Sequence, residues 1–172
     1  MAKVRRAAPE AMTTHAQPRA AKGGIAAGDP VFGRVFRAGP FAARAVLGSV
    51  RRGLATRGVP RPVCEDVELV LAEVINNVVE HAYADGDGPI TLTVSLAPGR
   101  IICLIQDEGA PMGAARPAAG LAPVPAPVPP ASEAALPEGG FGWGLIHQLT
   151  SVVEYRRDGS RNRLHLEIAR EQ

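Results

Sequence analysis

The chain has 172 residues, of which 46% are hydrophobic and 21% are charged. These proportions are ordinary for a globular protein, and the length allows one domain with its own core plus a tail. No apolar run approaches the roughly 18–20 residues of a membrane-spanning helix, and the first residues lack the continuous apolar segment of a secretory signal peptide. Composition therefore disfavours membrane and secreted proteins and predicts a cytoplasmic globular domain.

Charge is distributed unevenly along the chain. The net charge is +2, but residues 1–28 hold five basic side chains and one acidic side chain. The remainder is slightly acidic, so we expect neither a direct nucleic-acid partner nor a membrane partner. Residues 1–28 are predicted to be a disordered basic tail. Contact with an acidic partner and an organelle transit peptide are the alternatives, although Pro9, Glu10 and Pro18 disfavour an amphipathic transit helix.

The two cysteines, Cys64 and Cys103, are far apart in the sequence. They lack the close spacing that pairs of metal-ligating cysteines have. We therefore expect two buried free thiols rather than a metal site or a disulfide, which suits a reducing compartment.

In chain order, the first predicted elements are a strand and two helices. Residues 31–36 are β-branched and aromatic enough for an edge strand. From Pro40 to about Arg57 the apolar residues recur at helical spacing, and Gly58 and the prolines after it end that helix. A second helix is predicted from near Val63 to Tyr83 because its apolar residues form a wide stripe. The stripe consists of Val67, Val70, Leu71, Val74, Ile75 and Val78.

The next elements are two strands and a long loop. Residues 90–96 alternate between apolar and hydroxyl side chains, and residues 101–105 are mostly apolar. The short turn at Pro98-Gly99 makes these strands antiparallel neighbours. Residues 110–138 are dominated by alanine and proline, which favours either a lid or a disordered loop.

The last elements are a short helix and two strands. The glycine-rich segment 139–144 leads into an apolar helix, and strands are predicted at 152–157 and 163–168 around the turn that begins at Asp158. Residues 29–172 are thus predicted to be one α+β domain. Its architecture is a two-layer sandwich, in which a mixed, mostly antiparallel sheet carries three helices on one face.

The second helix contains an unusual polar segment. Asparagine is unfavourable inside a helix because its amide competes for the backbone, yet Asn76 and Asn77 are adjacent there. Glu73 and Asn77 are spaced i, i+4 and share a face, which can hold a hard cation and the phosphates it carries. His81 lies one turn further and is either a helix-end histidine or part of the same site.

Two other features lie at the ends of predicted elements. Asp107 directly follows a buried strand and is either a turn residue or a ligand. Glycines 139–144 either make a tight bend or let backbone N–H groups approach an anion at a helix start. They form neither a Walker loop nor a Rossmann fingerprint. Trp143 is either a core residue or a surface for adenine stacking.

In this order, the features resemble the nucleotide-binding motifs of the GHKL ATPase superfamily, which is named for gyrase, a heat-shock chaperone, histidine kinases and a mismatch-repair protein. The Glu73-x-x-x-Asn77 pattern is similar to the N box. The segment from Asp107 to Pro111 is similar to the first glycine box, and Gly139 to Gly144 is similar to the second. The anti-sigma-factor serine kinase branch is the most similar one, and the resemblance covers about Val31 to Ile168.

The resemblance implies a role for each matching position. Asn77 would ligate the Mg²⁺ that bridges the phosphates of ATP, and Glu73 would be the general base for a serine or a water. Asp107 would accept a hydrogen bond from the adenine amino group, and Gly109 would let the base lie close to the backbone. Residues 110–138 would form the ATP lid. The other implied cofactor-binding residues are His81, Pro111, Gly139, Gly140, Gly142, Gly144 and Leu145.

The resemblance also implies a function, namely a cytoplasmic anti-sigma regulatory kinase that uses ATP and Mg²⁺. It would phosphorylate a serine of an anti-anti-sigma partner of the STAS type, and so control a sigma factor by partner switching. Homodimers are common in that branch. Two departures are Met112, which replaces a bulky aromatic residue, and the lid, which has no basic residue after Arg116.

Three alternatives follow from the same sequence. The first is a module that binds a sigma factor or another regulator, with or without a nucleotide, and has no turnover. The second is a detached histidine-kinase catalytic domain, which is disfavoured because no phospho-acceptor helical hairpin precedes it. The third is a plain α+β domain without this chemistry.

Overall fold

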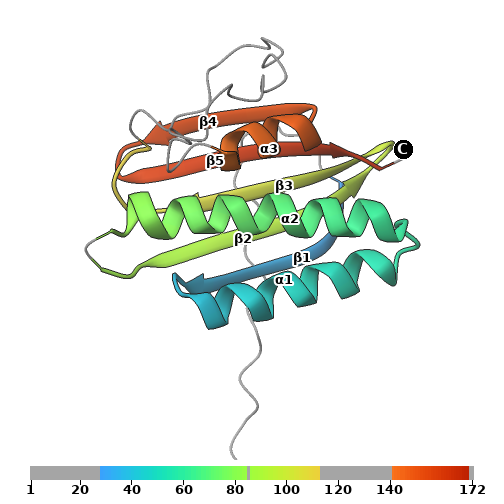
Figure 1. The fold of residues 1–172 in the computed structure, drawn as a ribbon, viewed down its shortest axis with the longest axis horizontal. Coiled ribbons are helices and arrows are strands. Elements are labelled where there is room, and N and C mark those ends of the chain that lie inside the picture. Colours follow the sequence, from blue (N-terminus) through green and yellow to red (C-terminus); the bar gives the residue numbers. More distant parts are fainter. Residues whose placement is uncertain (1–27, 85, 113–140, 171–172) are drawn as a thin grey trace, which may run out of the picture.

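The sheet of this protein is a single antiparallel layer that is covered on one face by helices (Figure 1). The computed structural model describes residues 28–84, 86–112 and 141–170. The elements are β1 (Asp29–Arg37), α1 (Pro40–Ala55), α2 (Arg61–Asn77), η1 (Val78–Ala82), β2 (Pro89–Ala97), β3 (Arg100–Asp107), α3 (Phe141–Leu149), β4 (Val152–Asp158) and β5 (Arg161–Ala169). The strand order is β1-β2-β3-β5-β4.

The predicted α+β sandwich is confirmed, with one correction to its sheet. All four strand pairs in the described residues are antiparallel, so the expectation of a mixed sheet is wrong. Each of the pairs β2–β3 and β4–β5 is joined by a short turn, which allows only an antiparallel hairpin. β1 is an edge strand, as predicted, and β4 forms the opposite edge.

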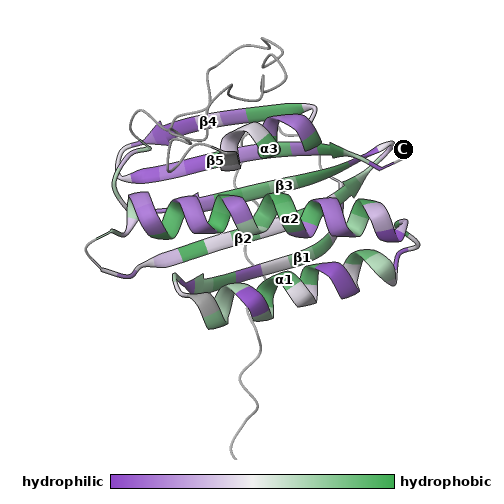
Figure 2. Ribbon diagram, in the orientation of Figure 1, coloured by the Kyte–Doolittle hydropathy of each residue, from purple (hydrophilic) through white to green (hydrophobic). Residues whose placement is uncertain are grey.

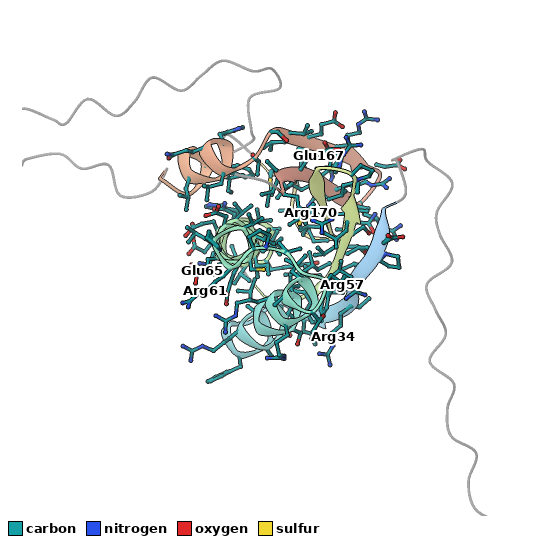
Figure 3. All side chains as sticks on the ribbon, turned by 90° about the vertical axis from the view of Figure 1, so that its right-hand side faces the viewer. Arg34, Arg57, Arg61, Glu65, Glu167 and Arg170 are labelled. Carbon is teal, nitrogen blue, oxygen red and sulfur yellow. The ribbon has the colours of Figure 1, made fainter. Side chains whose placement is uncertain are left out.

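The core lies between the sheet and the helices. Along β2 and β3 every second side chain is buried on the helix-covered face, so the period-2 alternation of the sequence sets the orientation of the sheet. In Figure 2 hydrophobic and hydrophilic residues alternate along α2, and its buried residues are Val63, Cys64, Val67, Val70, Leu71, Val74 and Ile75. Seen end-on in Figure 3, α2 carries the exposed pair Arg61 and Glu65 on the side away from the sheet.

Both cysteines are buried free thiols, as predicted from the sequence. Cys103 lies on the inner face of β3, where burial raises the pKa of its thiol to about 12. Burial likewise raises the pKa of the Cys64 thiol, which lies on α2. Both groups therefore belong to the core of the domain.

The end of α1 shows how a local signal stops a helix. Gly58 has a φ of 73°, a left-handed conformation that glycine adopts without steric cost. The N–H groups of Gly58 and Val59 donate to the carbonyls of Ala55 and Leu54, at 3.1 and 3.2 Å. This is a Schellman arrangement, so the predicted role of Gly58 in closing the helix is confirmed.

The second helix departs from the prediction at its C-terminal end. It was expected to run as one α-helix to Tyr83, but α2 ends at Asn77 and the π-helical turn η1 follows. In η1 the Tyr83 N–H donates to the Val78 carbonyl at 3.1 Å, an i→i+5 bond. Apolar periodicity cannot distinguish this wider turn from an α-helix, and such turns occur frequently at functional sites.

Several predicted features lie outside the described residues. They are the tail up to residue 27, the lid from residue 113 onward, and Gly139 and Gly140. The described part contains no helix that is long and apolar enough to span a membrane.

Two leucines on α2 provide a matched test of this packing. Leu71 is fully buried against the sheet, whereas Leu69 is 43% exposed. Leu71→Ala should lower the free energy of unfolding by about 2–5 kcal/mol, because it removes buried methyl groups and leaves a cavity. Leu69→Ala should cost under about 1 kcal/mol. Urea denaturation measures both, and equal losses would contradict the predicted orientation of α2.

Candidate functional site

The first turn of α3 packs directly on the polar side of α2. A Cβ atom added to Gly142 would lie 2.7 Å from Oε2 of Glu73 and 3.9 Å from Nδ2 of Asn77. Glu73 and Asn77 therefore share one face, as their spacing predicts, and that face is opposite the glycine-rich start of α3. A Cβ atom here would displace the end of the Glu73 side chain, so the glycine leaves room for the carboxylate in this position.

The amide of Asn77 lacks a hydrogen-bond partner within the described part of the chain. Its Nδ2 atom is buried and unpaired. A buried polar group left unpaired costs about 1–3 kcal/mol, so a group of this kind is expected where a ligand binds. This cost supports a role for Asn77 other than folding.

The donor set beside Asn77 suits a cation that arrives with its own ligands. No group of three or more His, Cys, Asp or Glu side chains in the described ranges is placed to hold a metal ion. One amide oxygen is too few for an all-protein metal site. It is sufficient for Mg²⁺, which usually keeps several waters and takes its other ligands from substrate phosphates. Asn77 therefore fits a phosphate-bound Mg²⁺.

Asp107 is a buried carboxylate at the end of β3, only 4% exposed. It continues the inner-face alternation of Ile101, Cys103 and Ile105, so it lies on the same side of the sheet as the helices. Its Oδ1 accepts hydrogen bonds from the Gly109 N–H at 3.0 Å and from another side chain at 2.7 Å. Oδ2 receives none from the described residues, so one oxygen of this carboxylate is left for a ligand.

The loop after Asp107 is held against the end of η1. A Cβ atom at Gly109 would lie 2.3 Å from the carbonyl oxygen of Ala82, a contact that backbone atoms cannot relieve. The Ala110 N–H donates to the same carbonyl at 2.9 Å. The π-helical turn and the strand end therefore meet along the backbone, which fixes the loop relative to Asn77.

Tyr83 holds the other side of this loop. Its hydroxyl donates to the Pro89 carbonyl at 2.9 Å and accepts the Glu108 N–H at 3.0 Å. Burial is the main reason that the pKa of Tyr83 is raised. A Cβ atom at Gly88 would lie 2.1 Å from the Tyr83 ring, so the ring lies directly on the glycine backbone.

The remaining predicted site residues are placed less closely. His81 lies on η1, is exposed, and makes no hydrogen bond or ion pair with the described residues. Pro111 is exposed, Leu145 is half-buried, and a Cβ atom at Gly144 would meet nothing within 4 Å.

Asn162 is a polar residue of this region that the sequence motifs do not identify. It is only 1% exposed and donates the 2.7 Å hydrogen bond to Asp107. The signal was present, since Asn162 continues the alternation of Leu164, Leu166 and Ile168 and therefore lies on the apolar face of β5. A polar residue at an inner-face position needs a partner, and here the partner is the Asp107 carboxylate.

The chain belongs to the family described as "Histidine kinase-like ATPase domain", which matches residues 36–168.

Similar proteins include two curated kinases. Serine-protein kinase RsbW of Halalkalibacterium halodurans is 33% identical over 107 residues, which cover 62% of this chain and 64% of that protein. The protein of the same name from Bacillus mycoides is 28% identical over 115 residues, covering 66% and 70%. A solved histidine kinase domain from Erythrobacter litoralis is 20% identical with a TM-score of 0.44, covering 76% of this chain and 62% of that one.

The close contact at Gly109 predicts the outcome of a substitution. Gly109→Ala should lower the free energy of unfolding by about 1–3 kcal/mol, because the new methyl group must displace the backbone of Ala82. Gly33→Ala on β1 is the matched control, since a Cβ atom there meets nothing within 4 Å. It should change stability by about 0.5 kcal/mol or less. If the two variants unfold at the same urea concentration, the contact with Ala82 is not a constraint.

Proposed function

We propose that this protein is a cytoplasmic anti-sigma regulatory factor that binds ATP and Mg²⁺ and phosphorylates a serine of an anti-anti-sigma protein. The observation that carries the proposal is the approach of Gly142 to Glu73 and Asn77, which places a carboxylate and an unpaired amide beside a helix start. Membership of the ATPase family and similarity to two proteins named serine-protein kinase support it.

Each side chain has a chemical role in this proposal. Asp107 accepts a hydrogen bond from the adenine amino group through its open oxygen, and Gly109 leaves room for the base. The side-chain oxygen of Asn77 ligates Mg²⁺, and the ion, when bound, neutralises the phosphate charge. Gly139, Gly140, Gly142 and Gly144 line the phosphates, and His81, Pro111 and Leu145 complete the nucleotide site.

Glu73 is the proposed general base. Its Oε2 takes the proton from the partner's serine hydroxyl while the serine oxygen bonds to the γ-phosphorus and the bond to ADP breaks. Phosphoryl transfer depends mainly on positioning and charge stabilisation. A correctly positioned general base typically increases the rate by about 10²–10⁴-fold. The bare backbone of Gly142 permits this carboxylate to stand at the start of α3.

The proposed partners follow from the same reaction. Unphosphorylated anti-anti-sigma protein, of the STAS type, competes with a sigma factor for this chain, and phosphorylation ends that competition. The nucleotide state thereby changes which complex is stable. The chain acts as a homodimer in this proposal.

A second function has one observation in its favour. The segment 117–138 contains no lysine or arginine, so it offers no cation to hold a γ-phosphate. The alternative is a module that binds a sigma factor or another regulator without turnover. Incubation with labelled ATP and a candidate partner separates the two, because only the kinase leaves label on the partner's serine.

Glu73 can be tested with a substitution that preserves its shape. Glu73→Gln should lower phosphoryl transfer by about 10²-fold or more while ATP affinity changes little, because it removes the base but no phosphate ligand. Glu65→Gln, on the exposed side of the same helix, is the control and should transfer normally. Single-turnover transfer and equilibrium binding are measured for each. Full transfer by Glu73→Gln would exclude this residue as the base.

Nucleotide binding can be tested by thermal unfolding with ATP, ADP and Mg²⁺. ATP at 100 times its Kd should stabilise the fold by about 2.7 kcal/mol. Asn77→Ala should lose the Mg²⁺-dependent part of that gain, because it removes the proposed protein ligand of the ion. An unchanged melting temperature of the wild type at millimolar ATP would overturn the proposed function.

A further inference from the structure

The side chain of Asn162 uses all of its hydrogen-bonding capacity inside the protein. Its Oδ1 accepts from the Tyr155 hydroxyl at 2.7 Å and from Nη1 of Arg157. Its Nδ2 donates to Oδ1 of Asp107 at 2.7 Å and to the Ala110 carbonyl at 2.9 Å. Both N–H groups and the carbonyl oxygen of this amide therefore have partners within the protein.

Arg157 on one side, and the Asp107 carboxylate and the Ala110 carbonyl on the other, determine which way the amide faces. A guanidinium can only donate hydrogen bonds, so the atom of Asn162 that faces it must be the carbonyl oxygen. The NH₂ group must then face Asp107. The same Nη1 atom of Arg157 also donates to the Gly109 carbonyl at 3.1 Å, which ties β4 to the loop beyond Asp107.

This orientation has a consequence for Asp107. Oδ1 of Asp107 receives two hydrogen bonds, one from Asn162 and one from the Gly109 N–H. Two donors on one oxygen fix the rotation of the carboxylate group. The other oxygen, Oδ2, is then held in a defined direction as a free acceptor.

We propose that Asn162 is a positioning residue that orients the Asp107 carboxylate for a 6-amino purine, with Arg157 helping to set the orientation of Asn162. The inference rests on the proposed ATP site and adds to it the element that discriminates between nucleotides. A purine with a 6-oxo group presents an acceptor at position 6, where adenine presents its amino donor, so an Oδ2 atom held opposite position 6 favours the 6-amino purine. Asn162 itself does not touch the base, because its donors are already used.

The test compares two triphosphates on the full-length protein. ATP and inosine triphosphate differ at the 6-position, and Trp143, the single tryptophan, lies on α3 and reports binding by its fluorescence. The wild type should prefer ATP, and Asn162→Leu should lower the ratio of the two affinities by about tenfold or more. If Asn162 had a purely structural role, the substitution would weaken the binding of both nucleotides equally and leave the ratio of their affinities unchanged.

Arg157 supplies a second variant that does not depend on a buried substitution. Arg157 is exposed, so Arg157→Met should fold, and the ratio should fall because Oδ1 of Asn162 and the Gly109 carbonyl both lose the donor that holds them. Arg156→Met is the matched control, since Arg156 is its neighbour on β4 and has a side chain that is 79% exposed. This control should keep the wild-type ratio.

A pH profile gives an independent measurement. Asn162→Asp places a second carboxylate against Asp107, and two adjacent carboxylates share one proton until the pH exceeds the raised pKa of the pair. The shared proton replaces the amide N–H, so the preference for ATP should be partly restored at low pH and lost as the pH rises. The wild-type ratio should not change over the same range.

The outcomes distinguish this inference from the function on which it rests. If the wild type binds neither triphosphate, the proposed ATP site is wrong and the inference falls with it. If the wild type prefers ATP and both Asn162→Leu and Arg157→Met keep the full ratio, only the positioning role is overturned. A reduced ratio in both variants, with a normal ratio in Arg156→Met, supports the proposal.

Discussion

The close approach of the α3 backbone to the polar side of α2 is the contact on which the rest of the site depends. Gly142 favours it, because a Cβ atom there would displace the end of the Glu73 side chain. The contact places two polar side chains of one helix against the N-terminal turn of another. A helix start offers free N–H groups and a positive dipole end, so the same contact that orders Glu73 and Asn77 also produces an environment suited to phosphate.

The price of this arrangement is local stability. Within the described residues Asn77 keeps a buried amide nitrogen without a partner, and the glycines at 109 and 142 cost more backbone entropy on folding than other residues would. A buried unpaired donor is unfavourable in the protein alone and becomes favourable when a ligand supplies the acceptor. Such groups are rare in domains whose only requirement is to fold, and here the unpaired amide lies in the contact between α2 and α3.

The base end of the site is built differently. There, apart from Oδ2 of Asp107, the polar groups bond to one another: Asp107, Asn162 and the backbone of Gly109 and Ala110 are connected, and Tyr155 and Arg157 extend the network from β4. A low-dielectric surrounding strengthens such a network when every member has a partner. The site therefore combines a rigid end, which suits selection of a base, with an unsaturated end, which suits an ion and phosphates.

Much of this protein follows from local patterns in the sequence. Alternation at 90–96 and 101–105, the helical stripe of α2 and the left-handed glycine at 58 predict the elements and their faces, because backbone geometry converts spacing into orientation. The i, i+4 spacing also places Glu73 and Asn77 together.

Only the tertiary structure decided what lies opposite Glu73 and Asn77. The antiparallel pairing of β3 with β5 places Asp107 next to Asn162, although the two residues are 55 positions apart in the sequence. The π-helical turn places the Ala82 carbonyl against the backbone at Gly109 and Ala110. Hydrogen bonds between distant segments depend on register and on the docking of whole elements, which no local periodicity encodes.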